Sequence, residues 1–337
     1  MRRPDGSTLF LGAAIIGSLA LVMYVVFLNS DGQAQSTKRG EPTLATIPFD
    51  GQRSYEFLKQ ICELGPRISG TPAMTKQQEL LTAHFEKLGG RVSRQEFKAR
   101  HPLDGSAVTM TNLIVEWHPE AKERILLCAH YDTRPLPDQD PDFRLRKSGV
   151  FLGANDGASG AALLAEMAQH MAGLKSNYGV DFVLFDGEEL VYEAARDPYF
   201  LGSEHFAREY KSNPPAHRYR WGVLVDMIGD ASLELFQEKH SMTWRDTRPL
   251  TTEIWKTARD LGVKEFYARL GHEVRDDHLA LHDIAGIPTC DIIDFDYPKP
   301  GTRTPYWHTT HDTPDKCSAL SLAKVGWVLL EWLKRTK

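Results

Sequence analysis

The sequence predicts an α/β fold, a three-layer αβα arrangement around a central mixed, mostly parallel twisted sheet. From Phe49 onward, helical and strand patterns alternate along the chain, which is the order expected for a largely parallel sheet covered on both faces. Short apolar runs typical of buried strands recur, and three of them end at ionisable residues. Because open α/β sheets bind ligands outside the carboxyl ends of their strands, we expect a functional site at that edge.

The elements follow from local periodicity and from residues that end helices. Amphipathic spacing predicts helices over Tyr55–Leu64 and Thr75–Leu88, and each ends at a dipeptide containing glycine. An apolar helix is expected over Ala161–Met171 and an amphipathic one over Leu320–Leu333. The predicted strands are Arg91–Phe97, Met110–Trp117, Ile125–Ala129, Val180–Phe185, Val223–Val225 and Ile287–Ile293.

Composition indicates an ordinary globular enzyme domain. The chain has 337 residues, 42% of them hydrophobic and 25% charged, which suits one large catalytic domain over residues 49–337. A polar segment over residues 31–48 is predicted to be a linker. The net charge of -5 provides no basic surface for nucleic acid, so we exclude that partner. The four cysteines lie far apart; Cys128 and Cys290 are expected to be buried thiols, and one disulfide remains open.

The N-terminus predicts a membrane segment. Arg2 and Arg3 precede an uncharged stretch over Leu9–Leu28, which has about the length that a helix needs to span a bilayer. We expect a cytoplasmic tip and signal anchor over residues 1–30, with the catalytic domain extracytoplasmic, because the arginines stay in the cytoplasm. The alternative is a signal peptide cleaved near Ala34, which would leave a secreted or periplasmic protein.

Ionisable residues stand at the ends of three predicted strands. His130 follows the first of these strands, Glu188 and Glu189 follow the second, and Asp226 follows the third. Each acid alone is compatible with an ordinary solvated loop, but three strand ends that carry acids and a histidine favour a site. Because parallel strands share one carboxyl edge, these side chains are expected to converge.

A glycine-rich loop, Gly153–Gly160, places Asp156 just before a helix. One interpretation is that Asp156 merely caps that helix. The other is metal binding, because zinc prefers histidine nitrogens and carboxylate oxygens. Glu188, next to one of the candidate ligands, is then expected to lie over the open metal position as a proton carrier. The candidate ligands are His130, Asp156, Glu189, Asp226 and His308.

This ordered set resembles the zinc aminopeptidases of the co-catalytic type and their glutaminyl cyclase relatives. The resemblance implies an aminopeptidase-like fold, zinc as cofactor and N-terminal ends of peptides or proteins as substrates. In the aminopeptidases all five ligands would hold two zinc ions bridged by Asp156; in the cyclases Asp156, Glu189 and His308 would hold one. The resemblance runs from about Tyr55 onward and rests on His130-Tyr131-Asp132-Thr133, Gly153–Gly160, Asp186-Gly187-Glu188-Glu189, Gly202-Ser203, Asp226, Asp276-Asp277-His278 and His308-Thr309-Thr310.

Three features favour the animal-type glutaminyl cyclases. The interval from Glu189 to Gly202 is longer than the short turn of typical aminopeptidases, and Trp307 and the Asp-Asp-His run at Asp276 also resemble the cyclases. Trp307 is expected either to form the flat wall of a small substrate pocket or only to pack. Asp276 is expected either to act on substrate or only to cap a helix over His278–Ile284.

Other positions favour the aminopeptidases. The stretches Gly157–Gly160 and His308–Thr313 resemble that group more closely. Where the cyclases carry a tryptophan and a glutamine, this chain has Ala194 and Arg275. His130 is a zinc ligand in the aminopeptidase interpretation and a packing or supporting residue in the cyclase interpretation. The candidates to replace the missing tryptophan are Tyr192 and Tyr199.

The two interpretations imply different chemistry at the same residues. In the cyclase interpretation, the α-amine of an N-terminal glutamine attacks its own γ-carboxamide, whose carbonyl is polarised by zinc. Glu188 carries the proton to the departing ammonia, while Asp226 and Asp276 position the reacting nitrogens. In the aminopeptidase interpretation, Glu188 activates water for hydrolysis, and His130 and Asp226 hold a second zinc. A third hypothesis is a catalytically silent ectodomain, which would need neither the ligands nor Glu188.

Overall fold

The computed structural model describes residues 40–295 and 306–336. One compact unit begins at Pro42, and it includes Ile47, which is buried although it lies in the segment predicted as a linker. The predicted signal anchor over residues 1–30 lies outside the described residues. Within the described part, no helix is both long enough and apolar enough to cross a membrane.

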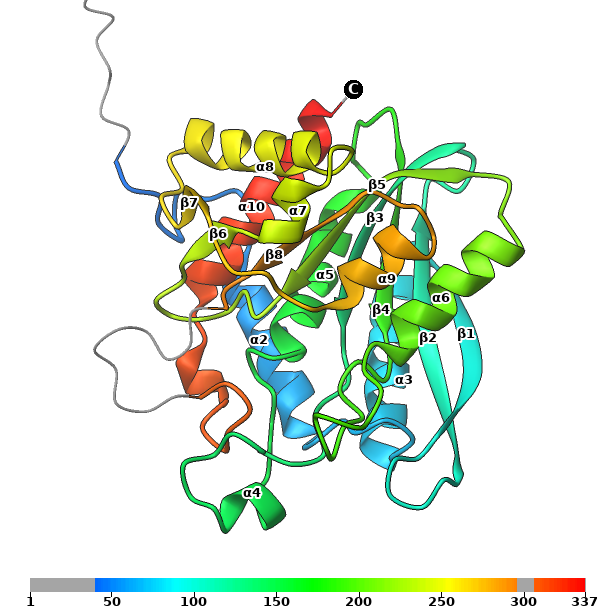
Figure 1. Cartoon of the computed structure of the whole chain (residues 1–337). Helices are drawn as coiled ribbons and strands as arrows, with labels where there is room; N and C mark the ends of the chain where they lie inside the picture. The colour runs from blue at the N-terminus through cyan, green and yellow to red at the C-terminus, as the bar shows by residue number, and fades with distance from the viewer. Residues whose placement is uncertain (1–39, 296–305, 337) are drawn as a thin grey trace, which may run out of the picture. The chain divides into compact units, whose positions relative to one another are not determined.

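Helices and strands alternate through this unit, as Figure 1 shows. The strands are β1 (Arg91–Arg100), β2 (Ala107–Trp117), β3 (Glu123–His130), β4 (Gly179–Phe185), β5 (Arg218–Asp226), β6 (Leu235–Gln237), β7 (Phe266–Leu270) and β8 (Thr289–Ile293). The helices are α2 (Gly51–Glu63), α3 (Pro72–Lys87), α4 (Leu145–Ser148), α5 (Ala158–Met171), α6 (Leu201–Ser212), α7 (Lys239–Thr243), α8 (Arg248–Leu261), α9 (Asp277–Asp283) and α10 (Ala319–Arg335).

The central sheet has six strands in the spatial order β1-β2-β4-β3-β5-β8. Strands β4, β3, β5 and β8 run parallel to one another. Strand β2 is antiparallel to both of its neighbours, β1 and β4. The sheet is therefore mixed and mostly parallel, and the predicted fold class is confirmed.

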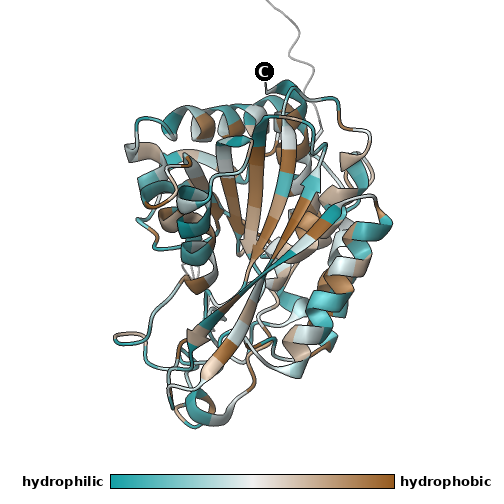
Figure 2. Ribbon diagram, turned by 90° about the vertical axis from the view of Figure 1, so that its right-hand side faces the viewer, coloured by the Kyte–Doolittle hydropathy of each residue, from teal (hydrophilic) through white to brown (hydrophobic). Residues whose placement is uncertain are grey.

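Helices cover both faces of this sheet because neighbouring side chains on a strand point to opposite faces. In β3, Ile125 and Leu127 belong to the larger core, formed with α2, α3, α5, α8 and α10. Leu126 and Cys128 belong to a smaller core, formed with α6 and α9. A strand that is buried on both sides carries an unbroken apolar run, and Figure 2 shows apolar residues concentrated in the central strands.

The predicted elements are all present, with some ends shifted. The first helix begins at Gly51 rather than Tyr55, because the Asp50 side chain accepts a hydrogen bond from the Arg53 amide and caps it. Two long helices were not predicted. Helix α6 buries only two apolar side chains, Phe206 and Ala207, whereas α8 carries buried residues at helical spacing that could have identified it.

All four cysteines are buried free thiols. Cys128 and Cys290 are completely buried, as predicted, and burial raises the pKa of each thiol well above its usual value. The disulfide that the sequence left open is therefore not formed in this structure.

A buried ion pair connects the strands at the amino-terminal edge of the parallel strands, opposite their carboxyl ends. Arg124 on β3 and Asp181 on β4 are both fully buried, and they form an ion pair with direct hydrogen bonds. The Arg124 guanidinium also donates to the carbonyl oxygens of Trp117 and His118, at 2.8 and 2.7 Å, and the Tyr219 hydroxyl donates to Asp181 at 2.6 Å. One guanidinium thus joins three strand ends.

We expect Arg124→Ala to lower the free energy of unfolding by about 3–5 kcal/mol, because it leaves the Asp181 carboxylate buried without its cation. The matched control is Arg218→Ala, which removes an exposed partner of Glu123 and should cost only about 0–1 kcal/mol. Urea unfolding of both variants measures the difference. Equal losses in the two variants would contradict the special role of the buried pair.

Candidate active site

The site lies at the carboxyl edge of the parallel strands. His130 is the last residue of β3 and Asp226 the last residue of β5, while Glu188 and Glu189 follow the end of β4. The structure brings Glu188, Glu189 and Asp226 to one pocket together with Asp156, and His130 lies within metal-binding distance of them. The convergence expected from parallel strands is therefore observed.

The loop that carries Asp156 approaches the end of β3 closely. Gly157 has φ +87, and a Cβ at this position would lie 2.7 Å from the carbonyl oxygen of Asp132, so only glycine fits here. Gly157 is also the N-cap residue of α5, and no side chain caps this helix. The interpretation of Asp156 as a helix cap is therefore wrong, and its carboxylate is free for the site.

Asp156, Glu189 and His308 form a candidate metal-binding group. Nε2 of His308 lies 3.0 Å from Oε1 of Glu189 and 3.4 Å from Oδ2 of Asp156, and all three residues are buried. His308 has φ 53, an uncommon conformation for a non-glycine residue that functional sites often hold. One imidazole nitrogen and two carboxylates are a donor set that zinc accepts.

The charges in this group also suit a cation. Burial and the charge of Glu189 raise the pKa of Asp156 to about 6. Although burial opposes ionisation of Glu189, the neighbouring His308 and Arg134 lower its pKa to about 2. Burial would lower the pKa of His308, yet Glu189 and Asp138 raise it to about 9. A cation between these side chains would relieve the repulsion of the buried carboxylates.

Arg134 and Asp138 support the ligands and were missed from the sequence. Arg134 donates to Glu189 through both its backbone amide and its guanidinium, at 3.1 and 3.2 Å. Oδ1 of Asp138 lies 3.2 Å from Nδ1 of His308, so it orients the ring with Nε2 toward the other ligands. Arg134 directly follows the recognised His130–Thr133 motif, but nothing local indicates that it contacts Glu189.

Two further aspartates fix the loops from behind. Asp132 accepts hydrogen bonds from the amides of Glu188 and Glu189, at 3.1 and 2.9 Å. Asp312 accepts one from the Asp156 amide at 3.1 Å and another from its neighbour Asn155. Both aspartates lie within motifs that the sequence singled out, yet their positioning roles required the structure.

His130, Asp156 and Asp226 form a second candidate metal group. Nε2 of His130 lies 3.1 Å from Oδ1 of Asp226 and 3.2 Å from Oδ1 of Asp156. Asp156 belongs to both groups, so it stands where a ligand shared by two ions would lie. The geometry therefore provides for one metal ion or two.

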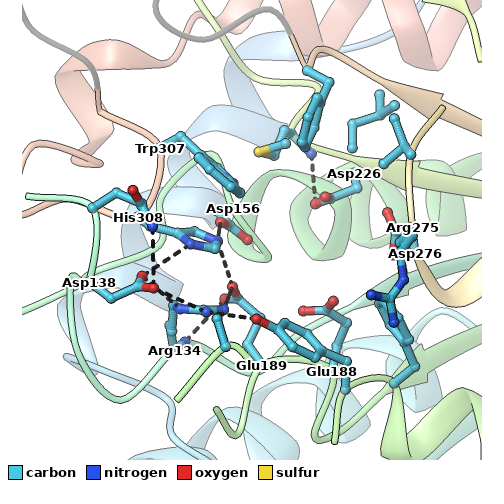
Figure 3. Close-up of a pocket in the computed structure, with 18 of the residues that line it drawn as sticks. Arg134, Asp138, Asp156, Glu188, Glu189, Asp226, Arg275, Asp276, Trp307 and His308 are labelled. Carbon is cyan, nitrogen blue, oxygen red and sulfur yellow. Dashed lines mark hydrogen bonds and ion pairs between the residues drawn. The ribbon is translucent and has the colours of Figure 1, made fainter. Parts of the chain in front are cut away.

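A cavity of about 360 Å³ opens above the ligands (Figure 3). Its wall includes Glu188, Asp226, Asp276 and Trp307, and its volume suits a small side chain with the adjoining peptide backbone. The Glu188 side chain is 13% exposed, and burial together with neighbouring carboxylates raises its pKa well above the usual value. A perturbed carboxyl that lines a cavity is a candidate to carry protons.

Asp276 and Trp307 each satisfy both interpretations made from the sequence. Asp276 caps α9, accepting from the Asp277 amide at 2.6 Å, and it also lines the cavity. Trp307 packs on His308 with the ring centroids 4.0 Å apart, and it also forms part of the cavity wall. Each residue therefore makes a structural contact and also lines the cavity in which a substrate would bind.

The two tyrosines proposed in place of a tryptophan lie in different parts of the structure. Tyr199 lines the cavity beside Ala194, and its hydroxyl accepts from Arg134 at 3.1 Å. Tyr192 lies in a different depression, against His101. Only Tyr199 is therefore placed to contact a substrate in this cavity.

The chain is similar to a known protein family and to known enzymes. The model of peptidase family M28 matches residues 112–333. A glutaminyl-peptide cyclotransferase of Drosophila melanogaster is 26% identical over 218 residues, which cover 63% of this chain and 57% of that protein. The chain thus spans little more than half of that relative.

Solved structures cover more of the fold. A glutaminyl cyclase of Fimbriiglobus ruber is 44% identical, with a TM-score of 0.80, over 90% of this chain and 100% of that one. A Zn-dependent exopeptidase of Parabacteroides distasonis is 29% identical, with a TM-score of 0.77, over 86% of this chain and 99% of that one. The same fold therefore occurs in a glutaminyl cyclase and in a Zn-dependent exopeptidase.

Proposed function

The chain belongs to peptidase family M28, and from this premise we propose that it is a zinc-dependent glutaminyl-peptide cyclotransferase, which converts the N-terminal glutamine of peptides to pyroglutamate and releases ammonia. One observation carries the proposal. Glu188, Asp226 and Asp276 lie in one cavity with the Asp156–Glu189–His308 group and an aromatic wall. The 44% identity to the Fimbriiglobus ruber cyclase across the whole of that chain supports it.

The ligand group would activate the substrate's side chain. A zinc ion held by Asp156, Glu189 and His308 would polarise the γ-carboxamide carbonyl of the glutamine. Asp138 and Arg134 keep His308 and Glu189 in place, so the ligands need not reorganise when substrate binds. The carboxamide carbon then becomes open to attack by the α-amine of the same residue, and no water is required.

Glu188 moves the proton in this scheme. It takes a proton from the attacking α-amine and delivers it to the nitrogen that leaves as ammonia. An α-amine has a pKa near 8 and is already partly neutral at physiological pH, so a strong base is unnecessary. The Asp132 contact with the Glu188 amide holds this residue at the cavity wall, while Asp226 and Asp276 hold the two nitrogens in place.

A second candidate function is hydrolysis of N-terminal residues. The His130–Asp156–Asp226 group favours it, because a second metal there would complete the two-metal site of an aminopeptidase. In that case Glu188 would activate water, and the α-amine would anchor the substrate rather than attack. Similarity to the Parabacteroides distasonis exopeptidase is compatible with this alternative.

Mass spectrometry of two peptides distinguishes these functions. The full-length chain, purified without chelator, is incubated with a peptide that begins with glutamine and a matched peptide that begins with leucine. Loss of ammonia from the glutamine peptide alone supports the cyclase, whereas release of free leucine overturns it in favour of the aminopeptidase. No product from either peptide would favour the silent ectodomain.

Trp307 is expected to contribute to substrate binding more than to metal binding. Loss of its aromatic wall in Trp307→Ala should raise KM for a glutamine peptide about five- to tenfold, while Trp307→Phe should retain most of the affinity. Steady-state kinetics and the zinc-to-protein ratio are measured on both variants. A parallel loss of zinc would instead assign Trp307 to holding His308, on which it stacks.

We also propose that residues 1–30 anchor the protein in a membrane with the catalytic domain on the extracytoplasmic side. The support is the uncharged stretch over Leu9–Leu28 behind two arginines. Alkaline extraction of the membrane fraction tests the anchor: the chain should stay in the pellet. Its complete release, with a shortened N-terminus, would favour a cleaved signal peptide.

A further inference from the structure

Arg275 is a cation at the edge of the cavity without an ion-pair partner among the described residues. Its side chain is exposed and lines the same cavity as Glu188 and Asp276. In Figure 3 it lies on the side of the pocket opposite Trp307 and His308. The planar guanidinium of an arginine in this position can donate hydrogen bonds to a ligand that enters the cavity.

The other charged groups nearby do not neutralise it. Arg134, the second arginine of the cavity, is already engaged by Glu189, Asp138 and Tyr199. Glu273, close to Arg275 in the chain, is paired with Lys239 at 2.7 Å. No carboxylate in the described part of the chain therefore forms an ion pair with Arg275, whose side chain lines the cavity.

The backbone around Arg275 is anchored on both sides. The amide of Val274 donates to Glu238 at 3.2 Å, and the Val274 side chain is buried. On the other side, Asp276 caps α9 and is itself buried. The cation is thus presented from a fixed segment of chain, which lowers the entropy lost when it binds a partner.

The cavity consequently has a mostly acidic interior and, at its edge, a cation with no ion-pair partner among the described residues. Its interior is lined by carboxylates, whereas its edge carries Arg275. In the proposed reaction the interior receives the N-terminal residue with its amine, so the second residue of the substrate emerges at the edge. The carboxylates deep in the cavity are Asp156, Glu188, Glu189, Asp226 and Asp276; Asp138 and the exposed Glu273 also line it, and these two are paired with Arg134 and Lys239.

We propose that Arg275 is a specificity-determining residue that favours substrates with a carboxylate on the second residue. The carboxylate is either the side chain of aspartate or glutamate or the terminal carboxylate of a glutaminyl dipeptide; both have the planar geometry that an arginine binds with two parallel hydrogen bonds. This inference rests on the proposed cyclase function. Because the pair is exposed to solvent, its effect is modest and falls with added salt.

Kinetics on matched peptides test the proposal. We measure kcat/KM of the full-length zinc-loaded chain on amidated peptides that differ only at the second residue, which is glutamate, glutamine or lysine. A second pair compares Gln-Ala as the free acid with Gln-Ala amide. We expect glutamate to be preferred over glutamine about three- to fivefold, mainly through KM, with less preference at high ionic strength.

Three variants separate Arg275 from general effects. Arg275→Gln should abolish the preference, and Arg275→Lys, which keeps the charge, should restore part of it. Arg208→Gln, which removes an exposed arginine of α6 that pairs with Glu204, should leave the preference unchanged. A preference limited to the side-chain carboxylate or to the free dipeptide supports the proposal and identifies which source is bound.

Two results overturn the proposal, and they are distinct. Cyclisation of all glutamine peptides at equal rates, or a preference that persists in Arg275→Gln, removes the role of Arg275 and leaves the cyclase function intact. Failure to cyclise any glutamine peptide removes the proposed function, and the inference with it.

Discussion

Glu188→Gln is expected to lower kcat for cyclisation of a glutamine peptide by about 10²–10⁴-fold and to leave the zinc content unchanged. Glutamine has nearly the same shape but cannot accept and return a proton. The fold should tolerate the change, because the Glu188 backbone amide that donates to Asp132 is unaltered. Ammonia release measures turnover, and atomic emission measures zinc.

The matched control for this variant is Glu193→Gln. Glu193 lies on the same connection between β4 and α6 but is exposed, and it pairs with Arg196 on the surface. Its kcat should equal that of the unaltered chain. If Glu188→Gln kept more than about a tenth of the original turnover, the proton-carrier role would have to be given up.

Asp156→Ala is expected to remove the metal and with it all measurable turnover. The variant loses a ligand common to the Asp156–Glu189–His308 and His130–Asp156–Asp226 groups, so neither of these two keeps its full donor set. In the absence of metal, the Asp156→Ala variant should be no less stable than the original chain. Burial and the neighbouring carboxylates already make an ionised Asp156 unfavourable at this position. Added zinc should therefore raise the melting temperature of the original chain but not of the variant.

Two further variants serve as controls for this experiment. Asp283→Ala removes an exposed aspartate at the end of α9 and should change neither zinc content nor turnover. His130→Ala should leave the zinc-to-protein ratio unchanged if one ion is bound, and should about halve it if two are bound. A normal zinc content in Asp156→Ala would refute metal ligation by Asp156.

Most of the candidate site follows from local sequence. His130, Glu188, Glu189 and Asp226 are recognisable because each stands where an apolar strand ends, and the common edge of a parallel sheet makes them neighbours. The fold class is predictable for the same reason, since unbroken apolar runs between helical segments are typical of strands covered on both faces.

Contacts through space needed the structure. The pairing of Arg134 with Glu189 and of Asp138 with His308 joins segments far apart in the chain, and no local pattern encodes it. The same holds for the support of the loops by Asp132 and Asp312. Asp156 shows the converse: its position before a helix suggested a cap, and only the geometry of Gly157 excluded that.

By itself, the sequence determined the layered α/β architecture, the strand ends that carry the acids and the candidate zinc ligands, because hydrophobic periodicity and residue type are local properties. Only the tertiary structure decided the strand order, which of the two tyrosines enters the cavity, the double contacts of Asp276 and Trp307, and the place of Arg275 at the cavity edge. The physical reason is that packing and charge neutralisation depend on which segments meet, and that depends on the whole chain.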